Sequence, residues 1–172
     1  MHAFYWDASA LVKRYTPETG TPLVNDLFAH VTSDRMMCLI VGISEVISIL
    51  VRKKNARLIT DGAFIQALAD FRAEVIDSVA FKLVSVENEL VLASHPLIER
   101  HSLNATDALV LRSALDAAAM VRPAGNDIAL VASDHRLLRA ARTEGLHIFN
   151  PEVDTQAYLN ALIQADQGQE TT

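Results

Sequence analysis

Residues 4–15 read FYWDASALVKRY, and this stretch decides how the rest of the chain is interpreted. Three aromatic residues form an apolar run that ends on a single carboxylate, Asp7. Small residues follow Asp7, and the pattern then becomes helical. A short apolar run followed at once by a helix predicts a buried strand with an acid at its carboxyl end.

Four further apolar runs have the character of buried strands and lie at residues 36–41, 81–86, 127–133 and, more weakly, 146–150. Longer helical patterns separate them, at residues 8–15, 19–31, 43–54, 60–78, 87–101, 104–120 and 134–144. Apolar strands that alternate with helices predict a mostly parallel sheet covered on both faces. We therefore expect an α/β fold, a three-layer α/β/α sandwich with a sheet of about four to five strands, whose functional groups lie at the carboxyl ends of the strands.

The composition predicts one globular domain in a chain of 172 residues, of which 51% are hydrophobic and 21% charged. We assign residues 1–150 to this domain and residues 151–172 to a C-terminal helix with a mobile tail at 164–172. No apolar run approaches the ~20 residues of a membrane span. A single cysteine, Cys38, and the lack of a signal-peptide pattern predict a cytoplasmic protein. The net charge of -6 argues against a protein that coats nucleic acid through a general basic surface.

Three other acids further along the chain resemble Asp7 in that they are predicted near the start of a helix. Glu45 and Asp107 are each predicted in the first turn of a helix, and Asp134 directly follows the fourth strand. In a parallel sheet these helix starts share one edge, so the four carboxylates would converge. Clustered carboxylates repel one another, and a divalent cation that prefers oxygen ligands, such as Mg²⁺, relieves the repulsion.

Helix capping offers a structural explanation of the same acids. Asp is a favoured N-cap, and an acid in the first turn gains ~0.3–1 kcal/mol from the helix dipole. With Gly42 and Asn104 as caps, Glu45 and Asp107 would each be the third helical residue, as in a capping box. Two observations favour a functional site for the set: small residues flank the acids, and Glu45 interrupts the apolar segment CLIVGISEVISILV (38–51).

In four segments the chain resembles the PIN-domain ribonucleases, in particular the VapC-type toxins of bacterial toxin–antitoxin pairs. The segments are YWDASALVKRY (5–15), ISEVISIL (43–50), NATDALVLRSAL (104–115) and LVASDHRLLRAARTEGL (130–146). Their order and spacing also match, and the resemblance covers about residues 3–150.

The resemblance implies a metal-dependent endoribonuclease that hydrolyses RNA with a metal-activated water. Its acidic quartet would be Asp7, Glu45, Asp107 and Asp134, with Asp7 and Asp107 as the principal ligands of Mg²⁺ or Mn²⁺. The resemblance further implies a homodimer and a small antitoxin protein that inhibits the enzyme. A mean hydropathy of +0.20 fits apolar surface that is buried against a partner.

Supporting residues are expected around the acids. Ser9 and Ser133 match positions at which the family often has a small hydroxyl residue that orients the carboxylates. Because the acids cannot attract RNA, we expect basic residues to guide its backbone, with Arg136 as the first candidate. Other basic residues follow the acids along their helices: Lys13, Arg14, Arg52, Lys53, Lys54, Arg57, Arg139 and Arg142. Pairing with the helix dipole on a solvated face is the structural explanation of such residues.

Two other functions are compatible with the residues. A phosphatase of the haloacid dehalogenase type also has an Asp after its first strand and forms a phospho-aspartate on it. That chemistry requires a second acid two residues later, where this chain has Ser9. A non-catalytic domain, in which the acids are caps and an apolar surface binds a protein, is the second alternative.

Overall fold

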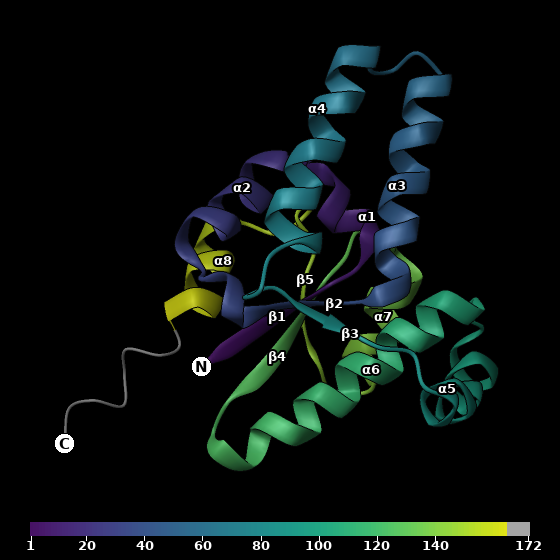
Figure 1. Ribbon diagram of the computed structural model, residues 1–172. Helices are drawn as coiled ribbons and strands as arrows, with labels where there is room; N and C mark the ends of the chain where they lie inside the picture. The colour runs from purple at the N-terminus through teal and green to yellow at the C-terminus, as the bar shows by residue number, and fades with distance from the viewer. Residues whose placement is uncertain (165–172) are drawn as a thin grey trace.

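The computed structural model describes residues 1–164 and has a sheet of five strands at its centre, in the order β3-β2-β1-β4-β5 (Figure 1). The strands are β1 (His2–Trp6), β2 (Met36–Leu39), β3 (Lys82–Val84), β4 (Asp127–Val131) and β5 (His147–Phe149). All pairings in this sheet are parallel. The predicted α/β sandwich with a mostly parallel sheet is therefore confirmed.

Helices cover both faces of the sheet (Figure 1). One face packs against α1 (Ala8–Leu11), α2 (Thr21–His30), α3 (Ile40–Asn55), α4 (Asp61–Phe71) and α8 (Gln156–Gln164). The other face packs against α5 (Asn88–His101), α6 (Ala105–Val121) and α7 (His135–Thr143). Short 3₁₀ turns occur at residues 12–14, 33–35 and 122–124.

The aromatic run of β1 divides between these two cores because successive side chains of a strand point to opposite faces. Phe4 and Trp6 lie in one hydrophobic cluster and Tyr5 in the other, and all three are buried. The hydroxyl of Tyr5 donates a hydrogen bond to Ser113 Oγ at 2.7 Å, so its one polar atom is satisfied inside the core. This central strand therefore needs an apolar residue at every buried position, as the sequence shows.

Several predicted element boundaries were wrong. β2 ends at Leu39 instead of residue 41, and α3 begins at Ile40 instead of residue 43. Glu45 consequently lies in the second turn of α3, where it cannot form a capping box with Gly42. The helix predicted over residues 60–78 is α-helical only to Phe71 and continues as a π-helical turn over residues 72–76.

The C-terminal helix α8 adds Leu159 and Leu162 to the core cluster that contains Phe4 and Trp6. Gln164, the first residue of the predicted mobile tail, is the last residue of α8. The rest of that tail lies outside the described residues. None of the helices within residues 1–164 is long and apolar enough to cross a membrane.

The order of the strands creates a crevice beside β1. The chain proceeds from β1 to β2 and β3 on one side of the sheet and then returns to add β4 and β5 on the other side. In open α/β sheets, ligands bind outside the carboxyl ends of the strands where the strand order reverses in this way. The backbone amide of Asp7 donates to the carbonyl of Val131 at 2.9 Å, so the ends of β1 and β4 are joined at this point.

Candidate functional site

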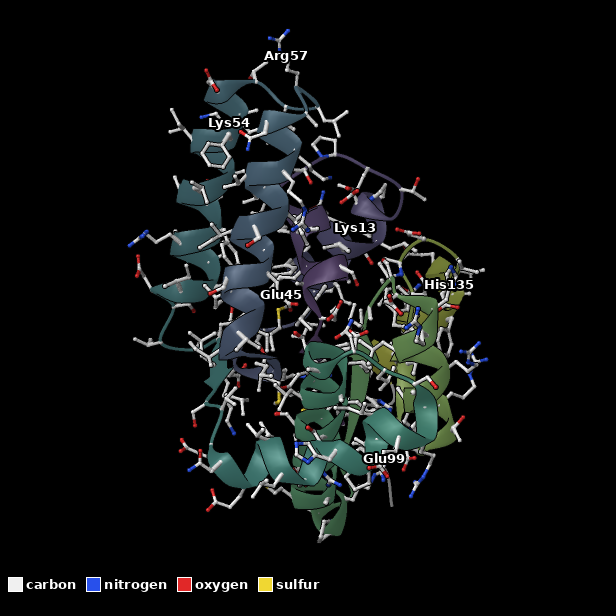
Figure 2. The ribbon with its side chains drawn as sticks, turned by 90° about the vertical axis from the view of Figure 1, so that its right-hand side faces the viewer. Lys13, Glu45, Lys54, Arg57, Glu99 and His135 are labelled. Atoms are coloured by element: carbon white, nitrogen blue, oxygen red, sulfur yellow. The ribbon has the colours of Figure 1, made fainter. Side chains whose placement is uncertain are left out.

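The structure brings the four predicted acids together around one pocket at the carboxyl ends of β1 and β4. The pocket has a volume of about 340 Å³. Figure 2 looks onto this side of the molecule, with Glu45 on α3 near the centre and His135, the first residue of α7, to its right. The described residues that line the pocket are Asp7, Ala8, Ser9, Ser44, Glu45, Ser48, Ile49, Arg52, Asp107 and Asp134.

Asp7 is the most buried of these acids, with 7% of its surface exposed. Its Oδ2 accepts hydrogen bonds from the amide of Ser9 at 2.9 Å and from the hydroxyl of Ser9 at 2.5 Å. The same hydroxyl oxygen accepts a bond from the amide of Ser133 at 2.9 Å. Ser9 therefore links Asp7 to the segment that carries Asp134. Ser133 contributes its backbone amide to this link, whereas its own hydroxyl is buried without a hydrogen-bond partner among the described residues.

Asp134 and Asp107 both take part in helix capping. Asp134 is the N-cap of α7, and its Oδ1 accepts the amides of Arg136 at 2.8 Å and Leu137 at 2.9 Å. Asn104 is the N-cap of α6 and accepts the amide of Asp107 at 2.8 Å. The side chain of Asn104 also donates to Asp107 Oδ2 at 2.8 Å. Asp107 is therefore the third helical residue behind the cap Asn104, as expected, but its carboxylate accepts the side-chain amide of Asn104 and not the backbone amide that a capping box would use.

Capping does not compete with a role for these acids in the pocket. The bonds from Ser9 go to one oxygen of Asp7, and the bonds described for Asp107 and Asp134 likewise go to one oxygen of each carboxylate. A carboxylate has two oxygens with about four lone-pair sites. Each acid can therefore hold the start of a helix with one oxygen and present the other to a ligand.

Glu45 has no comparable structural role, because it lies one full turn inside α3. Ser48, Ile49 and Arg52 follow it at spacings of three, four and seven residues, which places them on the same face of the helix. The sequence reading did not assign Ser48 or Ile49 to the site. Helical spacing from Glu45 is the signal that would have identified them.

The charges of the site act on one another. Burial raises the pKa of Glu45 to about 7, reinforced by the charges of Asp7 and Asp107 and opposed by Arg52. Burial raises the pKa of Asp107 to about 6, with contributions from Asp7 and Asp134 in the same direction. The pKa of Asp7 is also raised by burial, although its bonds to Ser9 act against this change. These carboxylates are therefore stabilised in the pocket when they bind either a proton or a cation.

The donor set matches the preferences of Mg²⁺ or Mn²⁺. Four carboxylates line the pocket, and no thiol or imidazole stands among its described lining residues. Across residues 1–164, no three His, Cys, Asp or Glu side chains are already arranged to hold an ion. Like charges repel one another when no cation is present. Direct coordination would therefore require rotation of the side chains of Glu45 and Asp107, which are only partly buried.

The raised pKa of Glu45 predicts how the stability of the metal-free protein depends on pH. Its pKa is about 7 in the folded protein against 4.5 for the unperturbed group. Between these values the folded state binds more protons than the unfolded state, so the contribution of Glu45 to stability falls as pH rises from about 4.5 to about 7. In EDTA, the melting temperature of Glu45→Gln is expected to fall less over this range than that of the unchanged protein.

The measurement to compare is how far the melting temperature falls in each of the two proteins. Burial lowers the pKa of His2, so the contribution of His2 to stability rises with pH, and it does so equally in both proteins. Glu99→Gln, an exposed change on α5 (Figure 2), is the matched control and should follow the unchanged protein. Equal slopes for Glu45→Gln and the unchanged protein would show that Glu45 is not in the electrostatic environment described here.

The fold is that of PIN-like proteins. This class has a parallel α/β/α sandwich, and the confirmed architecture agrees with the resemblance found in the sequence. No protein-family model matches the chain, and no curated protein matches it.

Solved structures with this fold include PAE2754 from Pyrobaculum aerophilum, with 19% identity, a TM-score of 0.55, and coverage of 93% of this chain and 94% of that one. The structure of FitAB bound to an IR36 DNA fragment has 12% identity, a TM-score of 0.61, and coverage of 89% and 98%. FitAcB from Neisseria gonorrhoeae has 12% identity, a TM-score of 0.56, and coverage of 88% and 99%. At these identities the likeness establishes the fold.

Proposed function

We propose that this chain is a cytoplasmic, metal-dependent endoribonuclease that hydrolyses RNA phosphodiesters and serves as the toxin of a toxin–antitoxin pair. The observation that carries the proposal is that Asp7, Glu45, Asp107 and Asp134, from four separate segments, line a single pocket. This pocket lies where the strand order of a PIN-like sheet reverses. The four segments that resemble VapC-type toxins are the same four that carry these acids.

In this proposal Asp7 and Asp107 hold Mg²⁺ or Mn²⁺, and Glu45 and Asp134 complete the site directly or through water. The bound ion supplies positive charge that polarises a phosphate and lowers the pKa of a water molecule. Whichever of Glu45 and Asp134 does not bind the ion directly would accept a proton from the water that attacks phosphorus, while the P–O bond to the leaving ribose oxygen breaks. Ser9 fixes the orientation of Asp7 through its two hydrogen bonds.

Two observations favour a nuclease over the other functions considered. A phosphatase of the haloacid dehalogenase type needs an acid at position 9, and here both the amide and the hydroxyl of Ser9 are bonded to Asp7. A non-catalytic domain would explain the acids as caps, yet Glu45 caps no helix and carries a raised pKa inside the pocket.

The partners implied by the proposal are an RNA substrate, a second copy of the chain and a small antitoxin protein. Apolar side chains are exposed along the pair of helices α3 and α4, which extends from the body of the molecule (Figure 1). Val51 on α3 is 38% exposed, Ile65 on α4 is 67% exposed, and Leu58, in the segment that joins the two helices, is 73% exposed. A partner protein that packed on this pair of helices would bury these side chains.

Incubation of the purified chain with total RNA, in EDTA, Mg²⁺ or Mn²⁺, tests the activity. Cleavage is expected only with an added ion, because the uncompensated acids repel the phosphate backbone. A phosphomonoester substrate in parallel reactions tests the phosphatase alternative and should not turn over. Identical RNA profiles with and without ions, across structured and unstructured RNA, would contradict the nuclease.

A further inference from the structure

A second pocket, of about 330 Å³, lies between the C-terminal end of α5 and one side of α7, from Arg136 to Thr143. It differs from the first pocket in charge, since no carboxylate is among its described lining residues. We call it the basic pocket. Its polar lining residues are Arg100, His101, Ser102, Arg136, Arg139 and Thr143.

The start of α7 borders both pockets. Asp134 caps α7 and lines the acidic pocket, whereas Arg136, two residues later, lines the basic pocket. Arg139 follows one turn further along the same helix. The positive charge of Arg136 acts to lower the pKa of Asp107, so the two pockets lie within electrostatic reach of each other.

The basic pocket carries more positive charge than the carboxylates near it can balance. Arg100 Nη1 and His101 Nε2 share one acid, Glu144, each at 2.7 Å from its Oε1. Within residues 1–164, neither Arg136 nor Arg139 has a carboxylate partner within salt-bridge distance. Two guanidinium groups are therefore available for an anion from outside the chain.

The end of α5 fixes the position of Arg136. Ser102, the C-cap of α5, has a left-handed backbone with φ 53° and ψ 40°. Its carbonyl accepts a hydrogen bond from Arg136 Nη1 at 3.3 Å. A guanidinium has five N–H donors in a fixed planar arrangement, so most of the donors of Arg136 remain for a ligand.

Helix stability does not explain the position of Arg136. Arg136 lies in the first turn of α7, where the positive end of the helix dipole disfavours a cation. The placement is costly for the helix alone and becomes favourable when an anion binds beside it. Arginine is also the side chain whose geometry matches the two oxygens of a phosphate.

We propose that the basic pocket binds a backbone phosphate of the RNA strand next to the phosphate held at the acidic pocket. This inference rests on the proposed nuclease function and assigns the direction in which the strand leaves the acidic site, across the start of α7 toward the end of α5. Arg136 and Arg139 are the residues that contact the phosphate. The pocket supplies the attraction for a polyanion that the four acids lack.

The test is binding of a short, labelled, single-stranded RNA of mixed sequence, measured by fluorescence anisotropy in EDTA so that cleavage plays no part. Arg136→Gln with Arg139→Gln is expected to weaken binding about tenfold, because charge-assisted hydrogen bonds are lost. Each phosphate contact removed should lower the slope of log affinity against log salt by about 0.7. Thermal melts of every variant establish that the fold is retained.

Arg72→Gln is the matched control, because it removes the same charge at an exposed residue that lines neither the acidic nor the basic pocket and follows α4 on the other face of the sheet. It should bind RNA within about twofold of the unchanged protein, since only a general, screened charge is lost. An equal loss in Arg72→Gln, or unchanged affinity of the double variant, would overturn the proposal. So would a lack of measurable binding by the unchanged protein at low salt.

The experiment separates this inference from the proposed function. Metal-dependent cleavage with no loss of affinity in the double variant would keep the nuclease and remove the phosphate site. Binding that depends on Arg136 and Arg139, together with a failure to cleave RNA under any metal condition, would keep the phosphate site and remove the nuclease.

Discussion

Asp7→Asn is expected to reduce metal-dependent RNA cleavage by at least about 10³-fold, because stabilisation of transition-state charge by a metal is worth several kcal/mol. The protein should nevertheless fold. The carbonyl oxygen of Asn can still accept the amide of Ser9, which Asp7 now binds at 2.9 Å. The substitution also removes a charge whose burial is unfavourable, as the raised pKa of Asp7 shows. Single-turnover cleavage of a labelled RNA is the measurement.

Thermal melts give an independent readout of the same variant. In EDTA, Asp7→Asn should melt at or above the temperature of the unchanged protein at neutral pH. Addition of an ion at about 100 times its dissociation constant should stabilise the unchanged protein by about 2.7 kcal/mol, roughly 5–10 °C, and Asp7→Asn far less. Asp116→Asn, on the same helix as Asp107 but outside the acidic pocket, is the control and should retain both activity and the response to metal. Residual cleavage above a tenth of the original rate would contradict the assigned role of Asp7.

Gly20→Ala is expected to destabilise the folded protein by about 2–4 kcal/mol. Gly20 precedes α2 with a left-handed φ of 92°, which any other residue adopts at a cost. A Cβ at this position would lie 2.8 Å from both the carbonyl carbon and the carbonyl oxygen of Pro151. These are backbone atoms, so they cannot rotate away. Chemical denaturation should therefore show a clear loss, equivalent to about 5–15 °C in melting temperature.

Gly62→Ala provides the opposite result in the same experiment. Gly62 lies in α4, and a Cβ there would meet nothing within 4 Å. Because alanine is a better helix former than glycine, this change should stabilise the protein by about 0.5–1 kcal/mol. Destabilisation of similar size by both substitutions would mean that the contact between Gly20 and Pro151 is not the cause.

The sheet could be predicted from the sequence because the apolar character of each strand and the alternation of strands with helices indicate the same fold. The strands β1, β2 and β4 are almost uniformly apolar, which is the pattern of a strand buried on both faces. The exact start of α3 could not be predicted. The segment IVGISEV is apolar at nearly every position, so periodicity gives no boundary, and Gly42 suggested a cap where the helix was already formed.

The acidic pocket could be predicted in part for a related reason. Acids that follow strands or open helices share one edge of a parallel sheet, so Asp7, Asp107 and Asp134 could be grouped before their positions were known. Glu45 was grouped with them on a predicted first-turn position that was wrong, and it lines the pocket from the second turn of α3. The basic pocket could not be predicted in this way. Arg100 and Arg139 line one pocket because α5 and α7 both pack against α6, and sequence spacing carries no signal of that arrangement.

Asp7 and Asp134 each cap a helix and also line the pocket, and Asp107 lines it from a position bonded to the cap of α6, Asn104; this dual use has an evolutionary consequence. Asparagine satisfies the same capping positions without charge, so a descendant of this chain can lose its acids one by one and keep its shape. A shared fold therefore does not tell a protein that keeps the four acids from one that has lost them. The identity of the residues at positions 7, 45, 107 and 134 is what distinguishes them.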